Sequence, residues 1–388
     1  MSKDSIYTRH PLLTLCSVFI ISFIVLLSVT EFVLSFTTFE GYAESRGESR
    51  AIRLKERSPL SQDVAIPAGE HLTKAIGLEQ KEYPWRAEKN GFIADQGWIT
   101  QPEFKIIFFG GSTTECLYVD EKDRLPAAVA NLFRSEGVRV NAYNGGVSGN
   151  NVLHSLDAFI NKGIPLRPQA VVLMHNINDI SIHLMQGGYW NDDSGKSLVI
   201  PLDQLTATGV KGWLRDAKDT LIPRTYAAFR TMKRRLTSMF SHGETAPSGI
   251  IPEGDLDEQQ IDMIVSSYRS AVLSFVRMAK TWCIPPVLLT QGSMFAPYET
   301  LPEPLRRSID SLASKQKISY RQIQDLHARF NDTLRSICAE EQCLLVDLDG
   351  RMSGNQDYYY DFVHMNGEGS LAAARLVHDA LEPLVKAQ

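Results

Sequence analysis

Ser112 follows a short apolar run and two glycines in the stretch KIIFFGGSTTECLYVD, residues 105–120. A serine on a tight turn after a strand can act as the nucleophile of acyl transfer. It then needs a base, a group that orients the base, and donors for a developing oxyanion. The same residues also have a structural interpretation, because a serine with a glutamate three residues later is a capping-box pattern. The stretch lacks the second glycine of the G-x-S-x-G elbow, so it does not predict an α/β-hydrolase.

The candidate base is His364, which follows Asp361 by three residues in YYYDFVHMNGEGS, just before the last expected helix. At this spacing the carboxylate can accept a hydrogen bond from one imidazole nitrogen while the other nitrogen faces a serine. An isolated D-x-x-H is a common pattern, and His175, near the end of an expected strand, is a rival base. Three other histidines fall within expected helices, where a structural role is expected: His154, His327 and His378.

Two loops of the chain offer donors for an oxyanion. Gly149, in NGGVSGNN, has a backbone N–H that a ligand can approach closely, and Asn178, in HNIND, has a side-chain amide. The N–H of Ser112 would be the third donor. Each loop also has a plainer interpretation, because glycine and asparagine are ordinary turn residues. The occurrence of all these patterns in order along the chain favours the catalytic interpretation.

The four patterns together resemble those of the SGNH (GDSL-type) hydrolases. That family has a serine after the first strand, a glycine after the second, an asparagine in a G-x-N-D motif after the third, and a C-terminal D-x-x-H. In this chain the marks fall at Ser112, at Gly149, at Asn178 with Asp179, and at Asp361 with His364, and the resemblance covers about residues 103–386. Two positions depart from the family pattern: Gly111 replaces an aspartate, and Asn176 replaces a glycine.

The resemblance implies a serine esterase that needs no metal and no organic cofactor. Ser112, His364 and Asp361 would form the triad, and the oxyanion would be held by Ser112, Gly149 and Asn178. The substrate expected from the family is a small ester or an acylated glycan, with an O-acetyl ester on an envelope polysaccharide as the first choice. Two alternatives stay open: an O-acetyltransferase in which a sugar hydroxyl replaces water, and a catalytically silent glycan-binding module.

Short apolar runs alternate with helix-length segments from residue 105 onward. The runs are KIIFF, VRVNAYNGG, QAVVLMH, IPPVLLTQGS and CLLVDLDG, and the expected helices cover about 123–135, 151–163, 317–340 and 367–385. Strands that are apolar throughout and separated by helices predict a parallel sheet covered on both faces. We therefore expect a three-layer α/β/α fold with five parallel strands, which is also the fold of the SGNH family. The candidate residues then lie together at the carboxyl ends of the strands.

Residues 181–255 interrupt this alternation as an insertion. They include a basic stretch with apolar side chains at 212–236, which is expected either to cap the sheet or to contact a membrane surface or an anionic polymer. The whole chain of 388 residues has a formal net charge of −5, with no long basic stripe, and this argues against a nucleic-acid partner.

The first hundred residues differ from the rest. Residues 11–30 carry no charge, which predicts a single-pass membrane anchor over 11–36 after a short head of residues 1–10; a cleaved signal peptide is the alternative. Residues 37–100 are expected to form a polar stalk and 101–388 the hydrolase domain. Arg9 lies against the apolar segment and TTFEGYAE beyond it has no basic residue, which favours an extracytoplasmic domain. In that compartment Cys338 and Cys343 could form a disulfide; buried free thiols are the alternative.

Overall fold

The computed structural model describes residues 50–67, 69–193, 195–201, 252 and 254–387, together with several residues between 12 and 25. The chain divides into two compact units, one of residues 1–51 and 201–221 and the other of residues 52–200 and 222–388. In the smaller unit, the described residues between 12 and 25 are helical. No helix within the described ranges is both long and apolar enough to cross a bilayer. The anchor expected over 11–36 falls largely outside those ranges.

The larger unit is built around a five-stranded parallel sheet, as the sequence predicts. In the order β5-β4-β6-β8-β9, its strands are Val140–Gly146, Phe104–Gly110, Ala170–Met174, Pro286–Leu289 and Leu344–Val346. Strand β4 comes first in this part of the chain and has neighbours on both sides, and β6 is buried at every position. The chain leaves β4 toward β5 and later returns on the other side of β4 as β6. In open parallel sheets, ligand sites are expected at the carboxyl ends of the strands beside such a switch point.

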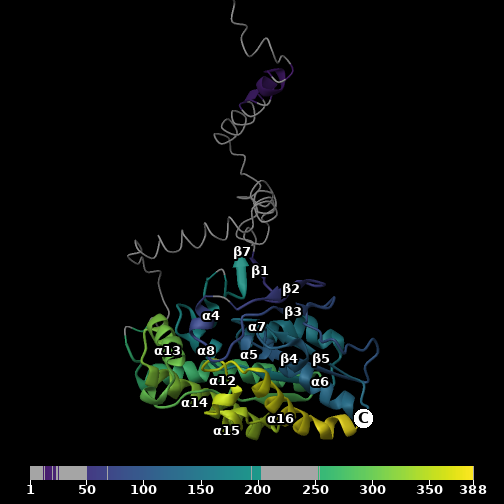
Figure 1. Cartoon of the computed structure of the whole chain (residues 1–388), viewed down its shortest axis with the longest axis vertical. Coiled ribbons are helices and arrows are strands. Elements are labelled where there is room, and N and C mark those ends of the chain that lie inside the picture. The colour runs from purple at the N-terminus through teal and green to yellow at the C-terminus, as the bar shows by residue number, and fades with distance from the viewer. Residues whose placement is uncertain are drawn as a thin grey trace, which may run out of the picture. The chain divides into compact units, whose positions relative to one another are not determined.

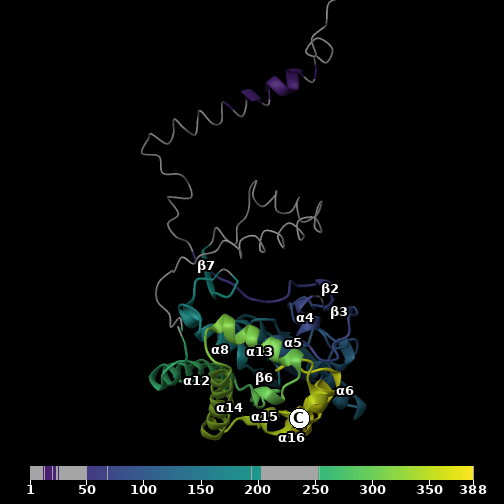
Figure 2. The same ribbon diagram turned by 60° about the vertical axis from the view of Figure 1, so that its left-hand side comes forward.

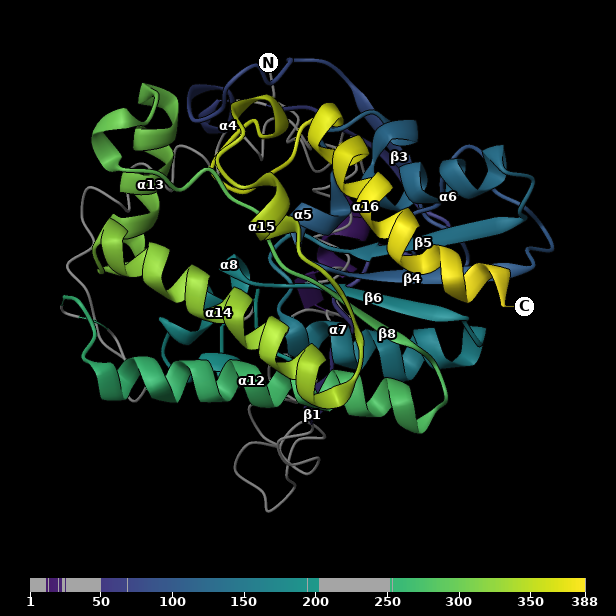
Figure 3. The ribbon, with the colours of Figure 1, turned by 90° about the horizontal axis from the view of Figure 1, so that it is seen from below.

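Helices cover both faces of this sheet (Figures 1 and 3). On one face the C-terminal helix α16 (Gly367–Lys386) packs beside α6 (Leu125–Ser135). On the other face α7 (Val152–Ala158) packs on α12 (Glu258–Thr281), and α12 lies beside α14 (Tyr320–Glu341) (Figure 2). The three layers that the sequence predicts are therefore present.

The remaining elements are short or lie outside the sheet. They are β1 (Arg50–Ile52), β2 (Gln62–Ala65), α4 (Glu70–Thr73), β3 (Tyr83–Arg86), α5 (Ser112–Glu115), α8 (Ile177–His183), β7 (Val199–Pro201), α13 (Glu303–Gln316) and α15 (Leu348–Met352). The sequence analysis did not predict α12 or α13. The basic stretch at 212–236 lies outside the described residues.

The segment before β4 is more than a polar stalk. From Ile52 onward it belongs to the larger unit, and β2 pairs with β3 in the antiparallel direction. Phe92 and Ile93 are buried, and the backbone N–H of Ile93 donates to the carbonyl of Asn144 on β5 at 2.9 Å. The expectation of a stalk over 37–100 is therefore wrong from Ile52 onward, because scattered apolar side chains in this polar segment are buried against the domain.

A disulfide joins Cys338 near the end of α14 to Cys343, just before β9. Of the two possibilities that the sequence left open for this pair, the structure contains the bridged one. The bridge closes the turn between α14 and β9, which is an edge strand of the sheet.

Candidate active site

Ser112 is the first residue of α5 and follows Gly110, which ends β4, and Gly111. A Cβ atom on Gly110 would overlap the Thr114 side chain, and one on Gly111 would overlap the amide nitrogen of Asn178. Close packing therefore explains the glycines, since Gly111 itself has an ordinary φ of −95°. The N-cap of α5 is Gly111 and no side chain caps the helix. The capping-box interpretation of this stretch is therefore wrong.

A chain of hydrogen bonds links Ser112, His364 and Asp361. Ser112 Oγ lies 2.7 Å from His364 Nε2, and His364 Nδ1 lies 2.7 Å from Asp361 Oδ2. The other carboxylate oxygen, Oδ1, accepts from the backbone N–H groups of Val363 at 2.9 Å and His364 at 2.7 Å. Because an ionised carboxylate can only accept, Nδ1 carries the proton and Nε2 presents a lone pair to the serine hydroxyl. The arrangement can therefore take a proton from Ser112.

The charges at these residues support that state. Burial alone would raise the pKa of the Asp361 carboxyl, but the adjacent His364 and the two backbone donors outweigh it and hold the pKa below its usual value. Burial alone would lower the pKa of His364, but the negative charge and hydrogen bond of Asp361, with a smaller contribution from Glu115, raise it instead. The ring of Tyr360 stacks on the imidazole at 5.6 Å and 7°, which restricts its tilt.

Candidate oxyanion donors follow the ends of three neighbouring strands, β5, β4 and β6. Asn178, in the first turn of α8 after β6, donates its amide to the carbonyl of Asn150 at 2.9 Å. Among the described residues, the second N–H of this amide has no hydrogen-bond acceptor. Gly149, in the loop after β5, has a φ of +76°, a conformation that favours glycine. Within the described part of the chain, no backbone acceptor bonds the N–H of Ser112 or of Gly149.

Glu115 holds the glycine loop in place, a role that the sequence analysis missed. Its side chain is buried, and Oε2 accepts from Ser148 N–H at 2.8 Å and from the Ser148 hydroxyl at 2.6 Å. Its other oxygen, Oε1, accepts from Arg57 Nε at 2.8 Å. Glu115 thus connects the nucleophile's helix, the loop that carries Gly149, and the segment before β4. The only sign of it in the sequence was a glutamate that also fitted a helix cap.

His175, the rival base, lies in a separate buried network. Its Nε2 is 2.7 Å from the Ser155 hydroxyl, and its Nδ1 is 3.3 Å from Asp179 Oδ2. Asp179 Oδ1 also accepts from the hydroxyl of Tyr189 at 2.6 Å and from the N–H of Val152 at 3.0 Å. All of these side chains are buried. The network fixes α8, which carries Asn178, against the start of α7.

The histidines expected to be structural are buried, and so is Asn176, which replaces the glycine of the family pattern. These histidines are His154, His327 and His378. Burial lowers the pKa of His154 to about 3 and that of His327 to about 4, so both rings are neutral at pH 7. Asn176 donates its amide to the His327 carbonyl and to Asn331 Oδ1, both at 2.9 Å. In place of a glycine, this chain therefore has a side chain that ties α8 to α14.

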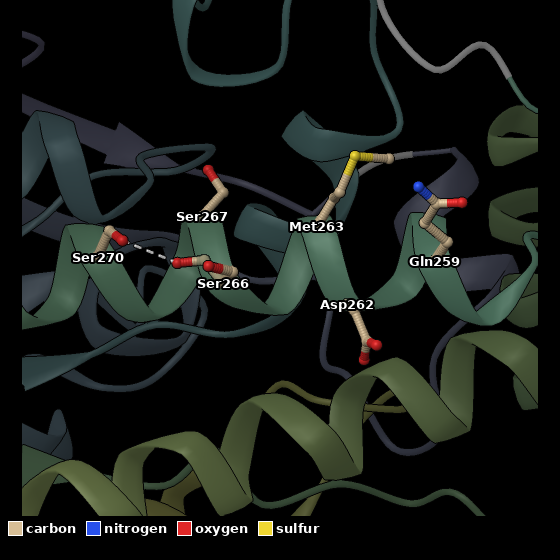
Figure 4. Close-up of a pocket in the computed structure, with 6 residues that line it drawn as sticks. All are labelled: Gln259, Asp262, Met263, Ser266, Ser267 and Ser270. Atoms are coloured by element: carbon tan, nitrogen blue, oxygen red, sulfur yellow. Dashed lines mark hydrogen bonds between the residues drawn. The ribbon is translucent and has the colours of Figure 1, made fainter.

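One hollow of the described surface lies away from this site. It measures about 650 Å³ and is lined by residues of α12 alone, including Asp262, Met263 and Ser266 (Figure 4). The Ser270 hydroxyl there donates to the carbonyl of Ser266 in its own helix at 2.9 Å. Within the described ranges, no three His, Cys, Asp or Glu side chains are placed to hold a metal ion.

No family model matches this chain, and no curated protein does. Solved structures do resemble it. One is a lipase/acylhydrolase from Enterococcus faecalis, with 12% identity, 72% of this chain and 96% of that chain covered, and a TM-score of 0.40. Another is a catalytic mutant of an acetylxylan esterase from Geobacillus stearothermophilus, with 15% identity, 74% and 96% covered, and a TM-score of 0.38. A third is an acetyl xylan esterase, with 13% identity, 72% and 100% covered, and a TM-score of 0.40. At such identities and scores, function has to be inferred from this chain's own residues.

Proposed function

We propose that this chain is a serine esterase of the SGNH type. His364 Nε2 takes the hydroxyl proton while Ser112 Oγ bonds to the ester carbonyl carbon, and the carbonyl oxygen becomes an oxyanion. The tetrahedral intermediate then breaks its bond to the alcohol, which leaves with the proton from His364. Water attacks the acyl-serine by the same route and releases the acid.

The hydrogen-bond chain from Ser112 through His364 to Asp361 is the observation that carries this proposal. The three residues that form this chain are at positions 112, 361 and 364 of the sequence. Packing for stability alone gives no reason to place the Ser112 hydroxyl against Nε2 of an imidazole whose other nitrogen is oriented by Asp361. The donors of Ser112, Gly149 and Asn178 supply the second requirement, because charge that develops on the carbonyl oxygen needs preorganised N–H groups.

The proposed substrate is an O-acyl ester, with acetyl as the acyl group and an envelope polysaccharide as the carrier. The proposed location is the outer side of the cell membrane, with residues 11–36 as the anchor. The Cys338–Cys343 disulfide supports this location, because disulfides persist in oxidising compartments and are rare in the cytosol.

The direct test is ester hydrolysis by the full-length chain. Wild type should hydrolyse short acyl esters such as p-nitrophenyl acetate, and Ser112→Ala should lose at least about 10³-fold in kcat. Ser270→Ala is the matched control, because it removes an exposed hydroxyl bonded only to its own helix. Equal hydrolysis by wild type and Ser112→Ala would reject the proposal.

A further inference from the structure

Lys55 lies beside the loop that carries the candidate oxyanion glycine. The amide of Asn150 donates to the carbonyl of Lys55 at 3.2 Å, and a Cβ atom on Gly149 would lie 3.1 Å from Lys55 Nζ. Asn150 is also the residue whose carbonyl accepts from Asn178 at 2.9 Å. The ammonium group is thus next to the backbone that would hold the reacting carbonyl, although it comes from a segment far away in sequence.

The surroundings of this ammonium group leave its charge poorly balanced. Burial, together with the positive charges of Arg53 and Lys196, lowers the pKa of Lys55 to about 8, against smaller opposing effects of Glu115 and Asp193. Neither acid is paired with it, and within the described ranges no carboxylate forms an ion pair with Lys55 Nζ.

Both acids accept hydrogen bonds from other donors. Glu115 accepts from Arg57 and from Ser148, and Asp193 Oδ1 accepts from the N–H of Gly195 at 2.8 Å. A half-buried ammonium group without an acceptor is costly, and an anion placed next to it would relieve that cost. Arg53 and Lys196 would add to the attraction for the anion, because the positive charges of both act on Lys55 and lower its pKa.

We propose that Lys55, with Arg53 and Lys196 around it, forms a subsite for an anionic group on the substrate. The substrate would then be an acylated glycan whose sugar carries a carboxylate or a phosphate near the ester. The inference rests on the proposed esterase function and adds the class of glycan. A carboxylate and a phosphate share the chemistry that Lys55 would recognise, namely oxygen acceptors with negative charge.

The test compares matched esters that differ only in charge. One arm uses an acetylated oligouronate and its neutral methyl-esterified analogue, and the other uses an acetylated sugar phosphate and the same acetylated sugar without phosphate. Wild type should favour the charged member of a pair in kcat/KM. Lys55→Ala should reduce that preference about 10- to 100-fold, the effect of losing one charge-assisted hydrogen bond. Lys55→Arg should keep most of it.

Lys386→Ala is the matched control. This lysine is at the far end of α16, about 30 Å of helix away from the His364 end, and pairs with Glu382. Its replacement should leave the preference unchanged. A wild type without preference in either arm, or a preference that survives in Lys55→Ala, would overturn the proposal.

Binding of deacetylated ligands separates this proposal from the esterase assignment. Calorimetry with a deacetylated oligouronate, and with the sugar phosphate, needs no catalysis. Binding by wild type that weakens about 10- to 100-fold in Lys55→Ala would support the subsite even if no ester were hydrolysed. Equal affinities in the two proteins, beside normal ester hydrolysis, would reject the subsite and leave the esterase proposal standing.

Discussion

Replacing Gly111 with alanine should slow catalysis, although residue 111 takes no direct part in the proposed chemistry. The new Cβ would overlap Nδ2 of Asn178 and lie 3.3 Å from its Cγ, inside the roughly 3.5–4.0 Å at which carbon atoms rest. The backbone at 111 is extended, so alanine is tolerated there. The side-chain amide of Asn178 must therefore move away from its present position. Losing one oxyanion donor costs about 10²–10³ in kcat, or roughly 2.7–4 kcal/mol.

A double-mutant cycle on kcat and KM tests the route of this effect. Gly111→Ala and Asn178→Ala should each lower kcat by a similar factor with KM little changed. The double variant should be no slower than Asn178→Ala, because both changes remove the same donor. Thermal unfolding of the four proteins is the control for general damage. Losses that multiply in the double variant, or a Gly111→Ala enzyme as fast as wild type, would refute this explanation.

Two further predictions concern the groups around the triad. Because the pKa of His364 is raised above 6.5 and the base must be neutral, kcat/KM should fall as the pH drops through a value above 6.5. Asp361→Asn should shift this fall in kcat/KM to lower pH and reduce kcat by about 10⁴-fold. An unchanged pH profile would contradict the role of Asp361. Glu115→Ala should lower the free energy of unfolding by about 1–3 kcal/mol in urea titrations, because it leaves Ser148 and Arg57 without their acceptor. Unchanged stability would show that Glu115 does not hold the loop.

Local patterns account for what the sequence predicted correctly. Strands β4 and β6 are buried on both faces, so they appear as continuous apolar runs that end at glycines or polar residues. Once the sheet is parallel, its carboxyl ends must lie together, and this places Ser112, Gly149 and Asn178 near one another without any knowledge of the side-chain contacts.

The site residues that the sequence did not predict depend on contacts between distant segments of the chain. Lys55 and Arg57 come from a polar segment with no periodic pattern, and only the folded chain brings them to Gly149 and Glu115. Helix α12 is different, because its buried face and its Asp257 capping box are visible in the sequence and were overlooked.

Covalent labelling tests the central claim, that Ser112 Oγ is the nucleophile, most directly. The full-length chain would be treated with a fluorophosphonate, digested, and mapped by mass spectrometry. We predict a single labelled serine, Ser112, with labelling absent in Ser112→Ala and strongly slowed in His364→Ala, because the imidazole must take the hydroxyl proton. A label on another serine, or undiminished labelling of Ser112→Ala, would contradict the claim.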